Sequence, residues 1–170
     1  MEADVELNGR AQSLMQDERW SDAIALIESD ASHLTDAELS WNAGWAHFKL
    51  GNYDAAELHL GRATQLAPTR AAAWWALGTA QREHGLLDEA ERNLKHALTL
   101  KDSSNSRSAL ALVLMQRGKL GEAEQIHLTG LELKPESPER WKSYACFLDD
   151  IGRIQEANAA YQKARYFEGA

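Results

Sequence analysis

Residues 74–102 read WWALGTAQREHGLLDEAERNLKHALTLKD, and this stretch decides the fold of the chain. From Trp74 the sequence has the spacing W-x2-L-G, and from Ala90 it has the spacing A-x3-L. Gly85 lies between the two motifs, and a glycine just past a helix can take the left-handed conformation that lets the chain turn back. The stretch therefore predicts a helix, a turn and a second helix.

The same pattern recurs along the whole chain in a register that one alanine per unit sets. The marker alanines follow one another at intervals of 33, 34, 33 and 34 residues: Ala23, Ala56, Ala90, Ala123 and Ala157. Five residues before four of them stands a glycine: Gly51, Gly85, Gly118 and Gly152. The first unit has Glu18 at that position, which makes it the most degenerate of the five.

Two further positions of the unit agree with this register. Twelve residues before each marker alanine stands a small residue, which lets two helices cross closely: Ala11, Gly44, Gly78, Ala111 and Ala145. Four residues after each marker stands a large side chain: Ile27, Leu60, Leu94, His127 and Tyr161. Agreement at three positions in all five units, and at a fourth position in four of them, indicates one structural repeat along nearly the whole chain.

In length and motif the unit resembles the tetratricopeptide repeat, a helix–turn–helix unit of about 34 residues. The resemblance implies an all-α fold, a right-handed superhelical solenoid of five hairpins that forms a single domain over residues 1–170. The expected repeats are approximately 4–36, 37–70, 71–103, 104–137 and 138–170. The expected helix pairs are 4–17 with 21–31, 37–50 with 53–66, 70–84 with 87–100, 104–117 with 120–133, and 138–151 with 154–167.

Local capping signals support these helix starts. Thr35 followed by Glu38 predicts a capping box before the third helix. Ser137 followed by Pro138 predicts an N-cap and a first-turn proline before the ninth. Residues 101–106, KDSSNS, are a polar connector that is too short to be a domain linker.

Composition excludes several classes of function. The net charge of −8, with no basic run, disfavours nucleic acid and anionic membranes as partners. Cys146 is the only cysteine, so the chain can form no internal disulfide and no multi-cysteine metal site. The N-terminal segment is acidic and lacks an apolar core, so no signal peptide is expected. No long apolar stretch occurs, so no membrane span is expected. We expect a cytoplasmic protein.

The resemblance implies that the first helix of each hairpin lines a concave groove that binds a protein or peptide. The family's groove positions select these candidate binding residues: Trp41, Asn42, Trp45, Phe48, Trp75, Thr79, Arg82, Leu112, Met115 and Asp149. Trp41, Trp45 and Phe48 lie at i, i+4 and i+7 on one helical stripe, and Trp75 holds the position of Trp41 one repeat later. These rings either pack between neighbouring helices or form an aromatic groove with binding hot spots.

The same positions indicate the kind of partner. Leu112 and Met115 extend the apolar strip, and Asp149 with Asp150 makes one end acidic, so a partner with an apolar stretch and a basic flank fits best. Asn42 is placed to hydrogen-bond a peptide backbone. Carboxylate clamping of the kind used for chaperone C-termini is not expected, because Trp41 and Trp45 stand where that subfamily has lysine and asparagine.

No catalytic, cofactor or metal site is expected. The six histidines show neither H-x3-H nor H-E-x-x-H spacing, and His59, His96 and His127 belong to second helices of different units. Cys146 has no histidine near it in sequence, and there is no glycine-rich phosphate loop. The chain is therefore not expected to be an enzyme.

The end of the chain suggests one more interaction. The last hairpin of a solenoid exposes a face that a further repeat would cover. Ala160, Ala164 and Phe167 are expected to leave an apolar strip there, which predicts a homodimer through the last repeat or a longer native protein.

Three functional hypotheses follow. The first is a scaffold or adaptor that binds a partner peptide or helix in the aromatic groove. The second is a dedicated chaperone that shields an apolar secretion or assembly substrate. The third is a helical tail of a larger enzyme. A repeat fold of this kind supports many roles, so the choice depends on the surface of the groove.

Overall fold

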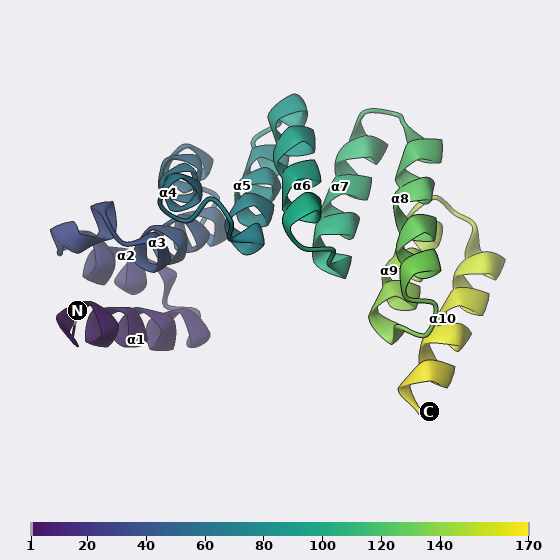
Figure 1. Cartoon of the computed structure of the whole chain (residues 1–170), viewed down its shortest axis with the longest axis horizontal. Helices are drawn as coiled ribbons and strands as arrows, with labels where there is room; N and C mark the ends of the chain where they lie inside the picture. Colours follow the sequence, from purple (N-terminus) through teal and green to yellow (C-terminus); the bar gives the residue numbers. More distant parts are fainter. Residues whose placement is uncertain (1, 170) are drawn as a thin grey trace. The chain divides into compact units, whose positions relative to one another are not determined.

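The computed structural model describes residues 2–169, with side chains from residue 5 onward, and the regular elements of this part of the chain are all helices. Ten α-helices and one short 3-10 helix follow one another in sequence (Figure 1): α1 (Glu2–Gln16), α2 (Trp20–Glu28), η1 (Ala31–Leu34), α3 (Ala37–Lys49), α4 (Tyr53–Leu66), α5 (Ala71–Glu83), α6 (Leu87–Leu100), α7 (Ser104–Gln116), α8 (Leu120–Leu133), α9 (Pro138–Asp150) and α10 (Ile154–Glu168). From α3 onward, every helix end lies within one residue of its predicted position. The predicted all-α class is confirmed.

The helices pack as antiparallel hairpins in two compact units. The first unit ends at Leu100 and holds α1 with α2, α3 with α4, and α5 with α6. The second begins at Lys101 and holds α7 with α8 and α9 with α10. Within the first unit α2 also packs on α3, and α4 on α5; within the second, α8 packs on α9. The five predicted hairpins are confirmed, and their union in one domain stays a prediction.

The turns inside the hairpins explain the spacing of the glycines. Gly51, Gly85, Gly118 and Gly152 have φ between 74° and 85°, a region that side chains with a Cβ disfavour. Glu18, which replaces glycine in the first unit, has φ 57°. The first hairpin therefore makes the same turn with a residue that is strained in it.

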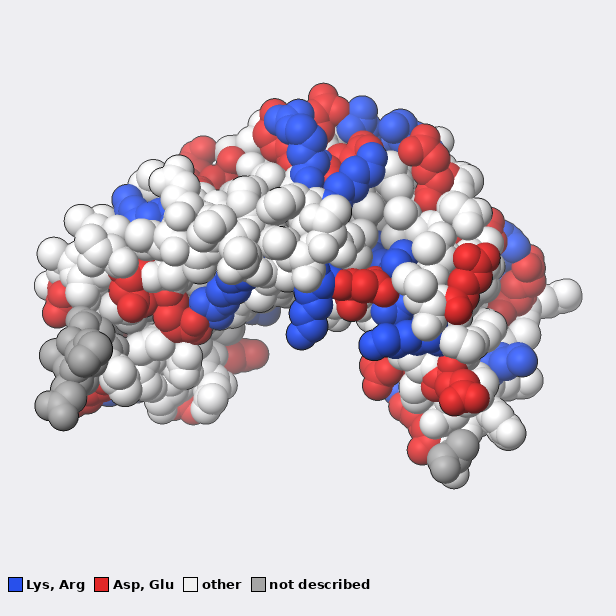
Figure 2. All heavy atoms as spheres, viewed as in Figure 1, with Lys and Arg blue, Asp and Glu red and all other residues white. Residues whose placement is uncertain are grey.

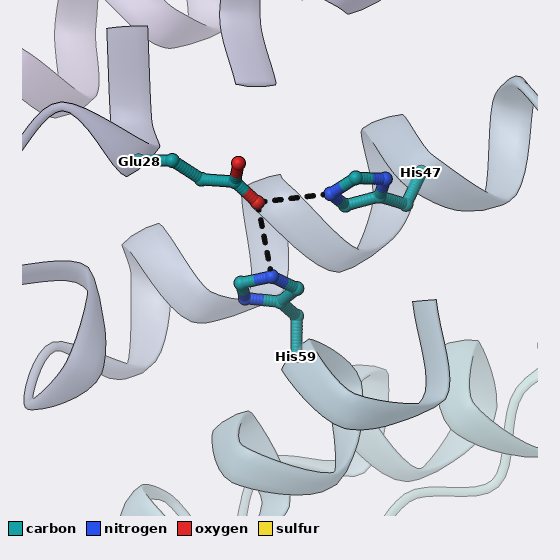
Figure 3. A group of neighbouring side chains, drawn as sticks. All are labelled: Glu28, His47 and His59. Carbon is teal, nitrogen blue, oxygen red and sulfur yellow. Dashed lines mark hydrogen bonds and ion pairs between the residues drawn. The ribbon is translucent and has the colours of Figure 1, made fainter. Parts of the chain in front are cut away.

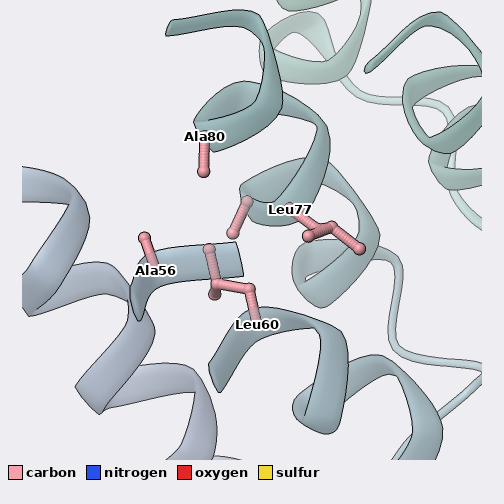
Figure 4. Close-up of a cluster of buried hydrophobic side chains, with 5 residues drawn as sticks. Ala56, Leu60, Leu77 and Ala80 are labelled. Carbon is pink, nitrogen blue, oxygen red and sulfur yellow. The ribbon is translucent and has the colours of Figure 1, made fainter. Parts of the chain in front are cut away.

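Small residues let the two helices of a hairpin touch. A Cβ added to Gly44 would lie 2.6 Å from Leu60 Cγ, and one added to Gly78 would lie 2.7 Å from Leu94 Cγ. Both leucines are fully buried. Figure 4 shows one core of the first unit, where Ala56 and Leu60 of α4 meet Leu77 and Ala80 of α5. Core packing thus joins one hairpin to the next as well as the helices within each.

The first repeat departs most from the prediction. Helix α2 ends at Glu28 instead of residue 31, and η1 follows it because the Asp30 carboxylate caps this short turn through the Ser32 amide. The N-cap of α3 is Asp36, whose side chain accepts from the Leu39 amide, so the capping box predicted at Thr35 is wrong by one residue. At α9 the predicted cap is confirmed, because Ser137 accepts from the Arg140 amide and Pro138 begins the helix.

The connector predicted at residues 101–106 anchors the second unit. Asp102 lies 2.6 Å from Arg107 Nε and 2.7 Å from Arg140 Nη2, and both arginines are buried. Arg140 also donates to the Gly130 carbonyl. One carboxylate therefore ties the start of α7 to the start of α9. It pairs with both arginines, each of which would destabilise the fold if it were buried without a partner.

More of the apolar surface of α10 is buried than predicted. Ala160 and Ala164 are 3% and 1% exposed, because they pack against α9, and Phe167 is half-buried. The expected strip of three exposed apolar residues is therefore wrong for two of them, and the large apolar side chains that α10 exposes are Ile154 and Tyr166. The homodimer through the last repeat stays a prediction.

The surface carries charges of both signs. Figure 2 shows acidic and basic side chains interspersed over the face in view, on a chain whose net charge is −8. Within residues 2–169, no helix combines the length and the apolar character needed to cross a bilayer.

Candidate functional site

Four of the predicted binding residues form one aromatic stack in the first unit. Trp41 and Trp45 of α3 lie parallel with ring centroids 5.9 Å apart, and Phe48 continues the row 4.9 Å from Trp45. Trp75 of α5 lies 5.3 Å from Trp45. All four rings are half-buried, and they pack against the core that α4 and α5 share. The predicted stripe is confirmed as a geometric cluster.

One side of this stack opens into a pocket of about 320 Å³. We call it the aromatic pocket, and its lining residues come from the first two repeats: Gln12, Met15, Gln16, Trp20, Trp41, Asn42 and Trp45. On the Trp41 ring rests the guanidinium of Arg70, 5.4 Å from the ring centroid, and Arg70 is paired with Glu38. Indole faces, a thioether and amide groups thus meet at an open surface.

Three predicted polar residues have hydrogen-bond or ion-pair partners within the chain. Asn42 is 1% exposed and donates its side-chain amide to Asn8 Oδ1, so it forms part of the pocket floor. Thr79 donates to the Trp75 carbonyl of its own helix and is 9% exposed. Arg82 is paired with Glu83. These contacts give each residue a structural role and leave Asn42 little freedom to meet a peptide.

The remaining predicted residues lie in the second unit, around another pocket. Leu112 and Met115 of α7 line a pocket of about 260 Å³, which we call the Met115 pocket. Its other lining residues are Ser108, Ala111, His127, Ser143, Cys146, Phe147 and Asp150. The acidic residue at this pocket is Asp150, whereas the predicted Asp149 is exposed beside it. Consecutive helical residues point about 100° apart, so only one of the two carboxylates faces the pocket.

His127 is the buried titratable group of the Met115 pocket. It is 5% exposed, and its ring centroid lies 5.1 Å from that of Phe147 and 6.0 Å from that of Tyr144. Burial lowers the pKa of His127 to about 4, and the nearby Arg107 acts in the same direction. The imidazole is therefore neutral at pH 7, and the pocket is apolar behind its acidic edge.

A second group of polar side chains was not predicted from the sequence. Glu28 Oε1 lies 3.0 Å from His47 Nε2 and 3.2 Å from His59 Nε2 (Figure 3). A hydrogen bond from His47 lowers the pKa of Glu28, and burial lowers the pKa of His59. Where no metal site was expected, three groups that can ligate a metal thus converge.

Comparisons with known proteins agree with the repeat architecture. The family model of the tetratricopeptide repeat matches residues 8–69 and 41–104. A crystal structure of MamA is similar with a TM-score of 0.70 and 20% identity, covering 94% of this chain and 94% of that one. Another crystal structure of MamA protein has a TM-score of 0.72 and 19% identity, covering 97% and 91%. A structure of MamA MSR-1 has a TM-score of 0.66 and 24% identity, covering 97% and 96%. The search of curated proteins finds no match.

Proposed function

Because the chain belongs to the tetratricopeptide-repeat family, we propose that it is a protein-interaction scaffold that holds an apolar segment of a partner in the aromatic pocket. Members of this family generally act by binding other proteins. The observation that carries the proposal is the half-buried stack of Trp41, Trp45 and Trp75 beside an open pocket. Tryptophan is enriched among the residues that contribute most to binding, and such residues cluster in pockets from which a partner excludes water.

The lining of the aromatic pocket suits an apolar side chain flanked by peptide groups. Indole faces and the flexible thioether of Met15 adapt to the shape of an apolar group. Gln12 and Gln16 are exposed at its edge, and each amide can donate to and accept from a peptide backbone. These two glutamines take the backbone-binding role that the sequence suggested for Asn42.

The Met115 pocket supports the second feature of the partner. Leu112, Met115 and Phe147 offer an apolar lining, and the Asp150 carboxylate stands at it. An apolar residue next to a lysine or arginine fills such a pocket and pairs with the acid. We therefore propose that a basic flank is read in the second unit, while the aromatic pocket reads an apolar stretch.

The proposal of a dedicated chaperone uses the same two pockets. It differs in its partner, because a chaperone shields one apolar substrate whereas a scaffold joins several proteins. A single co-purifying substrate favours the chaperone, and several partners favour the scaffold. For either role we propose a cytoplasmic location, on the acidic net charge and the single cysteine.

The test compares binding by wild type, Trp45→Ala and Trp74→Phe. Trp74 belongs to the same unit but donates its indole N–H to the Pro68 carbonyl and does not line the pocket, so its variant is the matched control. Partners captured by the wild-type chain are titrated by calorimetry and by tryptophan fluorescence. Loss of a hot spot costs about 2 kcal/mol or more, which is roughly a 30-fold increase in Kd. Equal affinity of Trp45→Ala and wild type for every captured partner would remove the aromatic pocket from the function.

A further inference from the structure

Glu28, His47 and His59 reach one point from three successive α-helices of the first unit. Glu28 is the last residue of α2, His47 lies near the end of α3, and His59 lies on α4 (Figure 3). Two imidazole nitrogens and one carboxylate oxygen of these residues all lie within 4.8 Å of one another. The cluster therefore ties the end of the first repeat to both helices of the second.

The repeat register shows that this cluster is an exception to normal packing. The positions of His47 and His59 correspond to Leu14 and Leu26 in the first repeat, to Leu114 and Ile126 in the fourth, and to Leu148 and Ala160 in the fifth. In the third repeat they correspond to Gln81 and Asn93, whose amides hydrogen-bond each other at 2.7 Å. The fold therefore needs a facing pair here but does not need histidine, and packing alone leaves the two imidazoles unexplained.

The geometry of the cluster fits a metal ion with few ligands. A tetrahedral zinc ion with bonds of about 2.0–2.1 Å holds neighbouring ligand atoms roughly 3.3 Å apart. Glu28 Oε1 lies 3.0 Å from His47 Nε2 and 3.2 Å from His59 Nε2, which is close to that separation, and the three ligand atoms all lie within 4.8 Å of one another. Imidazole nitrogens suit zinc and its transition-metal neighbours, whereas calcium and magnesium prefer oxygen ligands.

We propose that Glu28, His47 and His59 form a binding site for a divalent transition-metal ion of the zinc class, with a water molecule as the fourth ligand. The ion takes the place of the protons between the imidazoles and the carboxylate, and each ligating histidine is then neutral with its proton on Nδ1. This proposal does not depend on the aromatic pocket, because none of its three residues lines that pocket.

The three side chains differ in exposure, so an ion can enter from one side and is enclosed on the other. The side chains of His47 and His59 are 12% and 7% exposed, whereas that of Glu28 is 40% exposed. Solvent therefore reaches the site on the side of the carboxylate. Nδ1 of both histidines is buried without a hydrogen-bond partner, so the usual second-shell acceptor is missing among these side chains. We expect an affinity below that of zinc sites that have such acceptors.

Neighbouring charges set the pH at which the ion binds. The His33 ring lies 5.7 Å from that of His59, and its Nδ1 donates to the Asp30 carbonyl at 2.6 Å. After burial, the neighbouring His47 and then Arg62 of α4 and His33 disfavour a positive charge on His59 and lower its pKa. Glu28 is the anion that offsets them. Binding weakens as the pH falls, because protons compete for both imidazoles.

The test measures binding of Zn²⁺ alone to the full chain by calorimetry, with Co²⁺ absorption as a report on the ligand geometry. His47→Gln combined with His59→Asn reproduces the hydrogen-bonding pair of the third repeat, so this double variant removes two ligands and keeps a pair that the fold accepts. Glu28→Gln removes the third ligand at a largely accessible position. His84→Gln is the control, because His84 also contacts two carboxylates, Glu57 and Asp54, but has no second imidazole beside it.

The expected result is one Zn²⁺ per wild-type chain, a visible absorption band of four-coordinate Co²⁺, and a rise in the melting temperature that a chelator reverses. Both ligand variants lose at least about 10–100-fold in affinity, the loss known for second-shell residues alone, and His84→Gln binds like wild type. A wild-type chain that binds Zn²⁺ no more tightly than the double variant overturns the proposal. So does tight binding that Glu28→Gln and the double variant both retain, since the ion then lies elsewhere.

Discussion

Acid should destabilise this protein through His127 more than through any ordinary surface histidine. His127 of α8 stands where other repeats have Ile27, Leu60, Leu94 or Tyr161, and it is 5% exposed. Its ring is packed against Phe147 and Tyr144, so protonation would place a charge among apolar groups. For this reason the pKa of His127 falls from its ordinary value of 6.5 to about 4.

The sign and size of the effect follow from this difference in pKa. The unfolded chain binds a proton at His127 below pH 6.5, whereas the folded chain binds it only below about pH 4. The free energy of unfolding therefore falls as the pH drops from 6.5 to about 4, and the loss is complete below that range. At about 1.4 kcal/mol per pH unit, the full loss is about 3 kcal/mol.

The assay compares urea unfolding of wild type, His127→Leu and His96→Leu at pH 7 and pH 4.5. Leucine is the residue that two other repeats have at the position of His127, so His127→Leu should fold and lack this proton-linked loss. His96→Leu removes an exposed histidine and should keep it. Between the two pH values we expect wild type to lose roughly 2–3 kcal/mol more than His127→Leu. Nuclear magnetic resonance titration of the histidine ring protons gives the pKa of His127 directly.

Two results would refute the reasoning. One is an equal loss of stability in wild type and His127→Leu, since carboxylates and the other histidines contribute alike to both proteins. The other is a His127 ring that titrates near pH 6.5 in the folded protein, because burial then costs the charged form nothing.

The remaining predictions concern backbone conformation and helix contact. Glu18→Gly should raise the free energy of unfolding by about 0.5–1 kcal/mol, because Glu18 has φ 57°. Gly85→Ala should lower it by about 1 kcal/mol, because Gly85 has φ 85°. Thermal unfolding measures both effects, and a destabilised Glu18→Gly variant would contradict the argument. Gly44→Ala should cost about 1–3 kcal/mol, because its Cβ would meet Leu60 Cγ at 2.6 Å, whereas Gly61→Ala in α4 meets nothing within 4 Å and should gain about 0.5–1 kcal/mol. Equal effects of the two substitutions in chemical denaturation would show that helix propensity, not helix contact, decides.

The fold was predictable because each recurring residue type meets a structural requirement that is the same in every repeat. Gly44 and Gly78 are small because a leucine of the facing helix touches them. The glycines at the turns need a positive φ. Glu18 shows the limit of this reasoning, since the turn is kept where the preferred residue is lost. The end of α2 was mispredicted because the Asp30 cap of η1 outweighs helix propensity over residues 29–31.

The candidate site was predictable to the extent that one helix determines it. Trp41, Trp45 and Phe48 share a stripe of α3, so their spacing alone brings their rings together. Asn42 also lines the aromatic pocket, but its side-chain amide is taken by Asn8, which belongs to the preceding repeat. Contacts between repeats depend on the angle at which hairpins stack, and the spacing of residues along one helix does not predict that angle.

The cluster of Glu28, His47 and His59 also depends on contacts between helices, which the spacing along one helix does not predict. Comparison between repeats can reveal part of it. His47 and His59 are twelve residues apart in sequence, a spacing that no single-helix metal motif has, because they face each other across a hairpin. In a repeat protein, however, each pair of facing positions occurs five times, and the apolar pairs of three repeats show what packing requires there. An ion held by both Nε2 atoms leaves the two buried Nδ1 atoms without partners, so their cost lowers the expected affinity of the site. What singles out the second repeat is that its facing pair consists of two imidazoles with the Glu28 carboxylate 3.0 Å and 3.2 Å from them, whereas the polar pair of the third repeat is closed by its own hydrogen bond.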